Sequence, residues 1–464
     1  MLLPNVGIHD RARMQESARR RRMLEGVWEN DLLEAMAAYV SPEQFAAWGR
    51  PDTSSNVFRS TVNQLAVLYD RPVVIGHETD ESSAAAMREI TKSAAVWEQA
   101  PNLQRLVIGQ RESLRRVSWS DGRVTVRLVP VDRVTAESSP DDPANPHTVT
   151  EYRPREYDGK RIVTRDVLSV ANPDAPVYRV ESGDGGRDLT AYFLGGEFSG
   201  DRYPYRDQTG APVLPYALTH ANGAASKLFD PYEGSELVTG SLKVAVLWSF
   251  WSHILFDCSF PQKYGVNARP AGLASDPNTD ENATYIATDP ASLLLMEAVN
   301  PESPVALGQF APGGDPVAVG RAISEYQSLI AQQFDVGPSD IARSHADARS
   351  GYALIVQNEG KRAAQRKYEV GHRAGDLALM RICAVVHNTY SGGARVAESG
   401  YTIDYRPLPL SVDERRTRID EYRTRAELGV ASAVQLLAEL EGLTENQARA
   451  RLEQIRRDRL AFGA

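Results

Sequence analysis

The sequence predicts an α+β protein in which long helices and short strands occupy separate stretches of the chain. Segments 233–257 and 316–335 have helical periodicity, and a third helical pattern runs without a proline from about residue 348 to Tyr390. Residues 106–214 instead alternate polar and apolar side chains around Asp-Gly turn signals. Strands gathered in one stretch and helices in the others are typical of the α+β class.

Length and composition limit the kinds of protein that fit. The chain has 464 residues, enough for several domains, and its 42% hydrophobic and 24% charged residues are typical of globular proteins. A net charge of -9 disfavours a protein that grips nucleic acid through a dense basic surface, although it permits DNA to pass by. Cys258 and Cys383 form no metal-ligand pattern, and we expect a reduced, intracellular setting without a secretion signal.

The first region, residues 1–232, is predicted to contain helices followed by short strands. Asn56–Tyr69 has the spacing of an amphipathic helix, and Ser41–Gln44 has the sequence of a capping box that would begin another. The basic run Arg19–Arg22 predicts a solvated helix face. A contact with nucleic acid or with an acidic partner surface is the alternative for this run.

The strands of this region are predicted from turn signals. Asp121-Gly122 and Asp158-Gly159 are hairpin turns between β-rich arms. Val177–Phe198 is expected to continue in strands, with a break at its Gly-rich segment. This segment, GDGG, is a surface turn by our prediction and not a phosphate loop, because the sequence after it shows no helix that follows a strand.

Segment 233–257 is predicted to be a strongly apolar helix with Ser235 as its cap. Its apolar run, Val244–Phe256, is shorter than the roughly 20 residues that span a membrane, so we expect no membrane insertion. One face of this helix is too large for the following segment to cover. We therefore predict that a neighbouring subunit covers it, through the residues Leu247, Trp251, Ile254 and Leu255.

Residues 258–315 have the scattered prolines and glycines of a small irregular module with short strands. Helix 316–335 follows, with Asp315 as its cap and Pro316 at its first position, and Gly337-Pro338 ends it. The loop 336–350 is polar and has charges of both signs, so we expect it to face water.

Segment 351–410 is predicted to hold a very long helix and a strand. With its first turns from about residue 348, the helix would be about 65 Å long, and its glycines predict a kink. Residues 411–464 are expected to form two or three short helices separated by glycine stops, among them Gly429.

The motifs of common catalytic sites are absent from the sequence. It has no HExxH, GxSxG or Walker sequence, and its eight histidines form no paired-ligand pattern. We therefore expect no catalytic residue, no metal site and no cofactor, and predict that the protein is not an enzyme. A nucleic-acid enzyme with scattered carboxylates is the alternative from that class.

Three segments, taken in this order of elements, resemble the portal proteins of tailed bacteriophages, particularly those of siphophages. They are NVFRSTVNQLAVLYDRP, LFDPYEGSELVTGSL and AQQFDVGPSDIARSHADARSGYALIVQNEGKRAAQRKY. The order of elements over most of the chain contributes as much to the resemblance as these segments do. A different ring-forming connector or adaptor of a virion would share the long helix, and it is a second alternative.

The resemblance implies a portal fold and a role for each segment. Helices 233–257 and 316–335 would be stem helices, 258–315 the clip, and 411–464 a short helical crown. Residues 1–232 together with 351–410 would form the wing. The loop 336–350 would be the tunnel loop that meets DNA, through the residues Ser339, Arg343, Ser344, His345, Asp347 and Arg349.

The resemblance also implies partners and a location. Portal proteins form homo-oligomers, usually dodecamers, at one capsid vertex, and double-stranded DNA enters and leaves through them. Their partners are the terminase large subunit, a head-tail adaptor, the major capsid protein and, in some phages, a scaffolding protein. The chain would then be found in the virion, and in the host cytoplasm during assembly.

Overall fold

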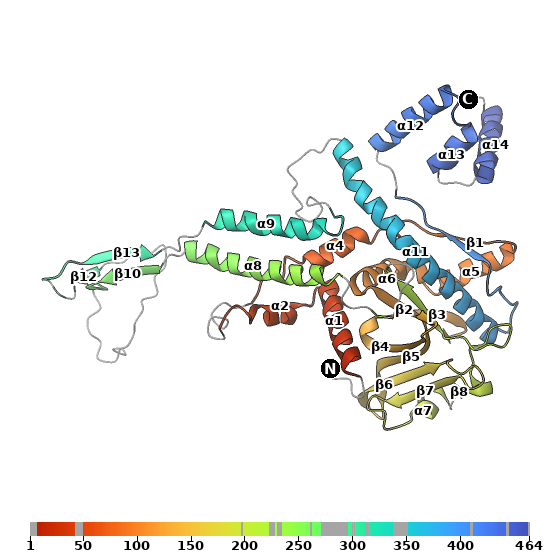
Figure 1. Ribbon diagram of the computed structural model, residues 1–464, viewed down its shortest axis with the longest axis horizontal. Coiled ribbons are helices and arrows are strands. Elements are labelled where there is room, and N and C mark those ends of the chain that lie inside the picture. Colours follow the sequence, from red (N-terminus) through yellow and green to blue (C-terminus); the bar gives the residue numbers. More distant parts are fainter. Residues whose placement is uncertain are drawn as a thin grey trace. The chain divides into compact units, whose positions relative to one another are not determined.

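The computed structural model describes residues 7–41, 50–195, 198–221, 228–229, 234–259, 262–270, 296–298, 300, 302–310, 315–336, 351–408, 412–441 and 445–462. It divides into two compact units. Unit 1 comprises Met1–Trp28, Val57–Val238 and Ile330–Ala464, and unit 2 comprises Glu29–Asn56 and Thr239–Leu329. Helices and antiparallel strands occupy separate stretches of the chain, which confirms the α+β prediction (Figure 1).

The helices of the described residues differ widely in length. They are α1 (Ile8–Glu25), α2 (Glu29–Met36), α4 (Val57–Leu65), α5 (Glu81–Ser93), α6 (Val96–Gln110), α7 (Thr190–Leu194), α8 (Ser235–Ser259), α9 (Pro316–Gln332), α11 (Gly351–Tyr390), α12 (Val412–Glu427), α13 (Ala433–Glu441) and α14 (Glu445–Phe462), with the 3₁₀ turns η1 (Val131–Arg133) and η2 (Gly200–Arg202).

The strands are β1 (Val74–His77), β2 (Glu112–Ser120), β3 (Arg123–Val129), β4 (Val134–Ser139), β5 (Asp142–Tyr157), β6 (Lys160–Ser169), β7 (Val177–Ser182), β8 (Phe198–Ser199), β9 (Tyr216–His220), β10 (Gln262–Val266), β11 (Ala268–Pro270), β12 (Met296–Ala298), β13 (Ala306–Phe310) and β14 (Tyr401–Asp404). In unit 1 they form a three-stranded sheet in the order β3-β2-β9, a five-stranded sheet in the order β4-β5-β6-β7-β8, and the pair β1-β14.

Both predicted Asp-Gly hairpins are confirmed. Asp121 and Gly122 join β2 to β3 with φ angles of 53° and 74°. Asp158 and Gly159 join β5 to β6 with φ angles of 50° and 67°. Positive φ at both central residues is the conformation of a type I′ turn, which Asp-Gly adopts readily.

Two strand predictions are corrected by helices. Residues 106–110 belong to α6, and the strand β2 begins only at Glu112, after Arg111 in the left-handed conformation. Within Val177–Phe198, residues Thr190–Leu194 form the five-residue helix α7. Thr190 is buried here and its hydroxyl accepts a hydrogen bond from the backbone N–H of Val180, so tertiary packing fixes a helical turn that the local pattern did not indicate.

A buried ionic network joins the two larger sheets. Arg116 of β2 donates from Nη1 to Asp166 Oδ2 at 2.8 Å and to Glu151 Oε2 at 3.3 Å, so one side chain bridges to both β6 and β5. Arg127 and Tyr216 also bond to Glu151, at 2.7 and 3.0 Å. Glu151 and Asp166 are almost fully buried, and arginines offset their negative charge. Buried charges are tolerated when they are paired in this way.

The long helix α11 packs against β2, β9 and β14 of unit 1. It has 40 residues and is therefore about 60 Å long, which confirms the predicted very long helix. Gly375 permits the close packing on β9, because a Cβ there would lie 3.1 Å from the carbonyl oxygen of Leu218 and closer still to Thr219. Two of the glycines expected to bend the helix thus have another use: Gly375 meets β9, and Gly360 meets the carbonyl oxygen of Asp335, 2.8 Å from where its Cβ would be.

The remaining helix predictions are mostly confirmed. Helix α4 lies within the predicted 56–69 segment and buries Val57 and Leu65. Helix α12 ends before Gly429, which has a φ of 66°, and α13 and α14 follow it as separate helices. The predicted capping box at Ser41–Gln44 lies largely outside the described residues.

The basic run of α1 is only partly the solvated face that the sequence predicts. Arg20 is 1% exposed and donates to Glu16 at 3.1 Å and to the carbonyl oxygen of Gly109 at 3.3 Å. Its neighbour Arg21 donates to Asp132 at 3.0 Å. The prediction is wrong for Arg20 because the helix packs against α6 on that side.

Candidate functional site in the helix pair α8 and α9

The helices α8 and α9 of unit 2 lie side by side and antiparallel (Figure 1). Both occupy the segments that the sequence predicts as helices. Helix α9 begins as predicted, since Asp315 Oδ1 accepts from the backbone N–H of Val317 at 2.9 Å and Pro316 is the first helical residue.

Trp251 is the central contact between the two helices. Its Nε1 donates a hydrogen bond of 2.7 Å to the carbonyl oxygen of Pro316. The indole lies on Gly320, where a Cβ would be 3.0 Å from Nε1, so a larger residue at this position would push the tryptophan away. Trp248 meets Trp251 edge to face, with ring centroids 5.0 Å apart, a favourable aromatic geometry.

Polar contacts continue the pairing toward the start of α8. Trp248 Nε1 donates to Gln327 Oε1 at 3.5 Å, a long hydrogen bond. The Lys243 ammonium lies 5.3 Å from the ring centroid of Tyr326, within the range of a cation–π contact. These contacts fix which side of α8 faces α9.

The other side of α8 meets the segment Glu29–Asn56 of the same unit. The Ser249 hydroxyl accepts a hydrogen bond of 3.0 Å from the backbone N–H of Asp52 and donates to the carbonyl oxygen of Ala245 at 2.9 Å. Phe250 meets Tyr39 edge to face at 6.3 Å. Helix α8 is therefore covered on two sides, which agrees with a helix that is apolar nearly all round.

The structure brings all four predicted interface residues onto α8 and leaves each of them half-buried in a single chain: Leu247, Trp251, Ile254 and Leu255. For Trp251 the covering residues are those of α9, an intrachain partner that the sequence did not reveal. The burial of these residues by a neighbouring subunit stays a prediction.

Helix α9 has a buried and an open side. Ile323 and Ile330 are buried on one side of the helix. On the open side, Val317 is 70% exposed and Leu329 is 58% exposed. Exposed aliphatic residues on a helix that is already packed on one side are compatible with a further contact surface.

A narrow β-ribbon joins the far ends of the two helices. β10 pairs with β13, from Gln262↔Phe310 to Val266↔Ala306, and β11 pairs with β12 farther along the same segment. Asn267, between β10 and β11, has a φ of 54° and its amide nitrogen donates to the carbonyl oxygens of Asn300 and Ser303. The predicted module of short strands at 258–315 thus consists, where described, of antiparallel pairs nested between α8 and α9.

The predicted tunnel-loop residues lie outside the described residues: Ser339, Arg343, Ser344, His345, Asp347 and Arg349. The two ends of their segment are described. Val336 is buried after the last turn of α9, and α11 begins at Gly351.

In the described part of the chain, no cluster of three or more His, Cys, Asp or Glu side chains could hold a metal ion. Asp376, a fully buried carboxylate of α11, accepts from Arg115, Tyr69 and Tyr405, and so is occupied by structural partners. Among the described helices, none is both long and apolar enough to cross a membrane.

Two solved structures show distant likenesses to this chain. No protein-family model and no curated protein matches the sequence. A chain from the neck of an empty gene transfer agent particle, computed with C6 symmetry, is 12% identical, with a TM-score of 0.43 over 84% of this chain and 90% of that one. A chain from the virion of a native gene transfer agent particle is 14% identical, with a TM-score of 0.39 over 90% of this chain and 99% of that one. At such low TM-scores neither likeness assigns a fold or a function to this chain.

Proposed function

We propose that the chain is the subunit of a ring-forming portal, a conduit through which genomic DNA is packaged into and ejected from a phage-like capsid. The observation that supports this best is the helix hairpin α8–α9 closed by a β-ribbon and followed by the 40-residue helix α11. This is the order of stem, clip, stem and wing helix that the resemblance of the sequence implies.

The proposal gives each part a role. Helices α8 and α9 would line the channel as the stem, and the ribbon β10–β13 would be the clip that meets the terminase large subunit and the head-tail adaptor. Helices α12 to α14 would be the crown. The partners would be other copies of the chain, capsid and scaffolding proteins, and double-stranded DNA passing through the ring. A non-enzymatic role fits a chain in which the buried carboxylates Glu151, Asp166 and Asp376 are paired with arginines.

Imaging of the purified chain tests the proposal. We expect negative-stain electron microscopy to show rings with a central hole, and mass photometry to give a mass of about twelve times the 51.0 kDa of one chain. A protein that stays a monomer at every concentration would contradict the ring. Rings without a hole would favour another virion connector, and ATP hydrolysis or DNA cleavage that co-purifies with the chain would favour an enzyme.

A phage-level experiment separates a portal from an adaptor. Particles made without the chain should contain no packaged DNA if it is the portal, because the motor then has no docking site. Particles that fill and then leak their DNA would instead indicate an adaptor that seals the vertex after packaging.

A further inference from the structure

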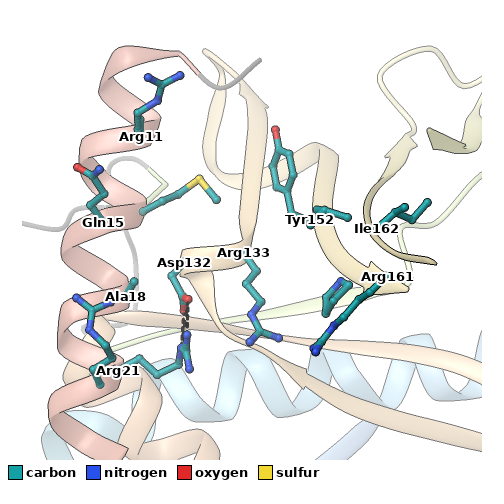
Figure 2. A pocket seen from close by; sticks show the side chains of 13 residues that line it. Arg11, Gln15, Ala18, Arg21, Asp132, Arg133, Tyr152, Arg161 and Ile162 are labelled. Carbon is teal, nitrogen blue, oxygen red and sulfur yellow. Dashed lines mark hydrogen bonds and ion pairs between the residues drawn. The ribbon is translucent and has the colours of Figure 1, made fainter. Parts of the chain in front are cut away.

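A cleft of about 730 Å³ lies in unit 1 between α1 and the strands β5 and β6 (Figure 2). Helix α1 forms one wall with a single stripe that includes Arg11, Gln15 and Ala18, and the strands form the other with Tyr152 and Ile162. The volume is within the range of ligand sites in proteins, about 300–1,000 Å³. None of the roles proposed above uses this cleft.

The wall formed by α1 is fixed in place by buried hydrogen bonds. Arg13, which is 6% exposed, donates to the carbonyl oxygens of Val131 and Val134 at 2.9 and 2.5 Å. Gln110 of α6 donates to the carbonyl oxygen of Ser17 at 2.9 Å. The cleft is therefore preformed, which lowers the entropy that a ligand must lose to enter it.

The floor of the cleft is apolar. Met14 and Tyr152 are almost fully buried and, with Val163, form a hydrophobic cluster separate from the main core. Ile162 is half-buried beside them. Such a floor favours an aliphatic side chain of a ligand over water.

The rim is strongly basic. Among the described residues that line the cleft, five are arginines and one is a carboxylate, Asp132, which already accepts from Arg21 and from Gln110. In the described part of the chain, the guanidinium groups of Arg11, Arg133 and Arg161 have no ion pair or hydrogen bond. Figure 2 shows Arg11 toward one end of the cleft and Arg133 and Arg161 toward the other. This excess of positive charge lies on a chain whose net charge is -9.

We infer that this cleft binds an acidic segment of a partner protein, with an aliphatic side chain on the apolar floor and flanking carboxylates on the rim arginines. Guanidinium groups bind carboxylates through paired hydrogen bonds, and those without an internal partner are the ones available to do so.

Nucleic acid fits the cleft less well. Single strands bind by stacking bases on exposed aromatic rings, whereas Tyr152, the aromatic residue among the described lining residues, is 4% exposed. Duplex DNA presents phosphates on a convex surface and has no group that would enter an apolar floor.

Fluorescence anisotropy with the full-length chain tests the inference. The probe is a short labelled peptide in which two leucines are flanked by aspartates and glutamates. Arg133→Glu combined with Arg161→Glu changes two exposed side chains without internal partners, so the fold should survive. We expect this double variant to bind the peptide about tenfold more weakly or worse, and wild-type binding to weaken as salt is raised.

Matched controls separate the floor from the rim. Arg179→Glu, an exposed arginine of β7 in the same sheet, should leave binding unchanged. A peptide with serines in place of the leucines should bind several-fold more weakly, which tests the floor without altering the protein. A peptide with lysines in place of the acids should not bind.

Two results would overturn the inference. One is equal binding of the acidic peptide to the wild type and to the double variant. The other is a labelled single-stranded oligonucleotide that binds more tightly than the peptide and is lost in the same variant, which would make the cleft a nucleic-acid site. Neither result depends on ring formation, so the test is independent of the proposed portal function.

Discussion

Trp251 Nε1 of α8 donates a hydrogen bond of 2.7 Å to the carbonyl oxygen of Pro316, the first residue of α9. One side chain thus joins the two helices at the end where the β-ribbon connects them. Trp251 is also one of the residues predicted to face a neighbouring subunit, so a substitution there alters both the helix pair and the predicted interface.

Trp251→Asp is expected to abolish the rings and leave smaller oligomers or insoluble protein. It removes the indole from Gly320 and places a carboxylate against the apolar surface of α9. Trp251→Phe keeps an aromatic ring and should lose only the hydrogen bond, about 1 kcal/mol of folding stability, with rings preserved. Mass photometry and negative-stain imaging measure the outcome.

Val317→Asp introduces the same charge at a position of α9 that is 70% exposed in the single chain, and so probes the open side of that helix. Rings of normal mass from Trp251→Asp would show that this part of α8 is not needed for assembly. Loss of rings from Val317→Asp as well would place the open side of α9 in the interface.

Gly375→Ala is expected to destabilise unit 1 by about 1–3 kcal/mol, since its added methyl group would meet the backbone and side chain of β9. Chemical denaturation followed by circular dichroism measures the change. Gly393→Ala is the control: its nearest neighbour, Ser391 Oγ, would be 3.8 Å from the new Cβ, and the stability should stay within experimental error. An unchanged midpoint for Gly375→Ala would mean that α11 can shift away from β9 at no cost.

His372 of α11 is predicted to make folding stability depend on pH. Tyr69 donates its hydroxyl proton to Asp376 at 2.8 Å and lies 3.0 Å from His372 Nδ1, so Nδ1 must be the protonated nitrogen. Nε2 is buried and has no hydrogen-bond partner in the described residues. Burial lowers the pKa of His372 to about 4. The charge of Asp376 partly opposes this shift, and the charge of Arg115 adds to it.

The unfolded chain takes up a proton at His372 at a higher pH than the folded chain does. Between the ordinary pKa of 6.5 and the lowered value, the unfolded chain is protonated at this residue and the folded chain is not. The free energy of unfolding should therefore fall by about 3 kcal/mol as the pH drops from about 6.5 to about 4. Above pH 6.5 this contribution of His372 to stability is complete. Urea titrations across this range measure it.

His372→Gln should remove this pH dependence, because glutamine does not titrate. His9→Gln makes the same chemical change at an exposed position of α1 and should retain it. A pH profile of His372→Gln that is identical to that of the wild type would assign the effect to another group.

The sequence predicts the helices, strands and turns better than it predicts the contacts between them. Helical period and Asp-Gly turns are local signals, and they located α8, α9, α11 and the β2–β3 and β5–β6 hairpins. The pairing of Arg115 with Asp376 joins positions 261 residues apart, and no local pattern indicates it. The same holds for the contact of Trp251 with Pro316, since periodicity shows that a helix has an apolar face but not what covers it.

The basic run of α1 is another case in which the sequence predicts a helix but not the contacts of its side chains. Four consecutive arginines point in different directions around a helix, so Arg20 is buried whereas Arg21 and Arg22 line the cleft. The signal that could have located the cleft is the helical stripe of Arg11, Gln15, Ala18 and Arg22, which repeats at three or four residues. The partner strands β5 and β6 could not be inferred from it.

Residues 337–350, between α9 and α11 in the sequence, are mostly polar and carry charges of both signs. The carbonyl oxygen of Asp335 lies against Gly360, so the end of α9 is held on α11 by residues outside this segment. Replacing 339–349 by a glycine-serine linker should therefore leave ring assembly intact. If the segment is the channel loop of a portal, Arg343 and Arg349 touch passing phosphates briefly and Asp347 keeps that contact weak.

Particles assembled with the linker variant should then contain less DNA or lose it faster, as measured by the ratio of filled to empty particles and by nuclease sensitivity of the packaged genome. Arg343→Ala combined with Arg349→Ala should reproduce part of this loss, because it removes the cations at unchanged loop length. Asp347→Asn is the matched control for a polar change, and by strengthening phosphate contacts it should slow packaging and not release. Normal filling and retention in the linker variant would exclude a role for this segment in DNA passage, since the ring itself would still be intact.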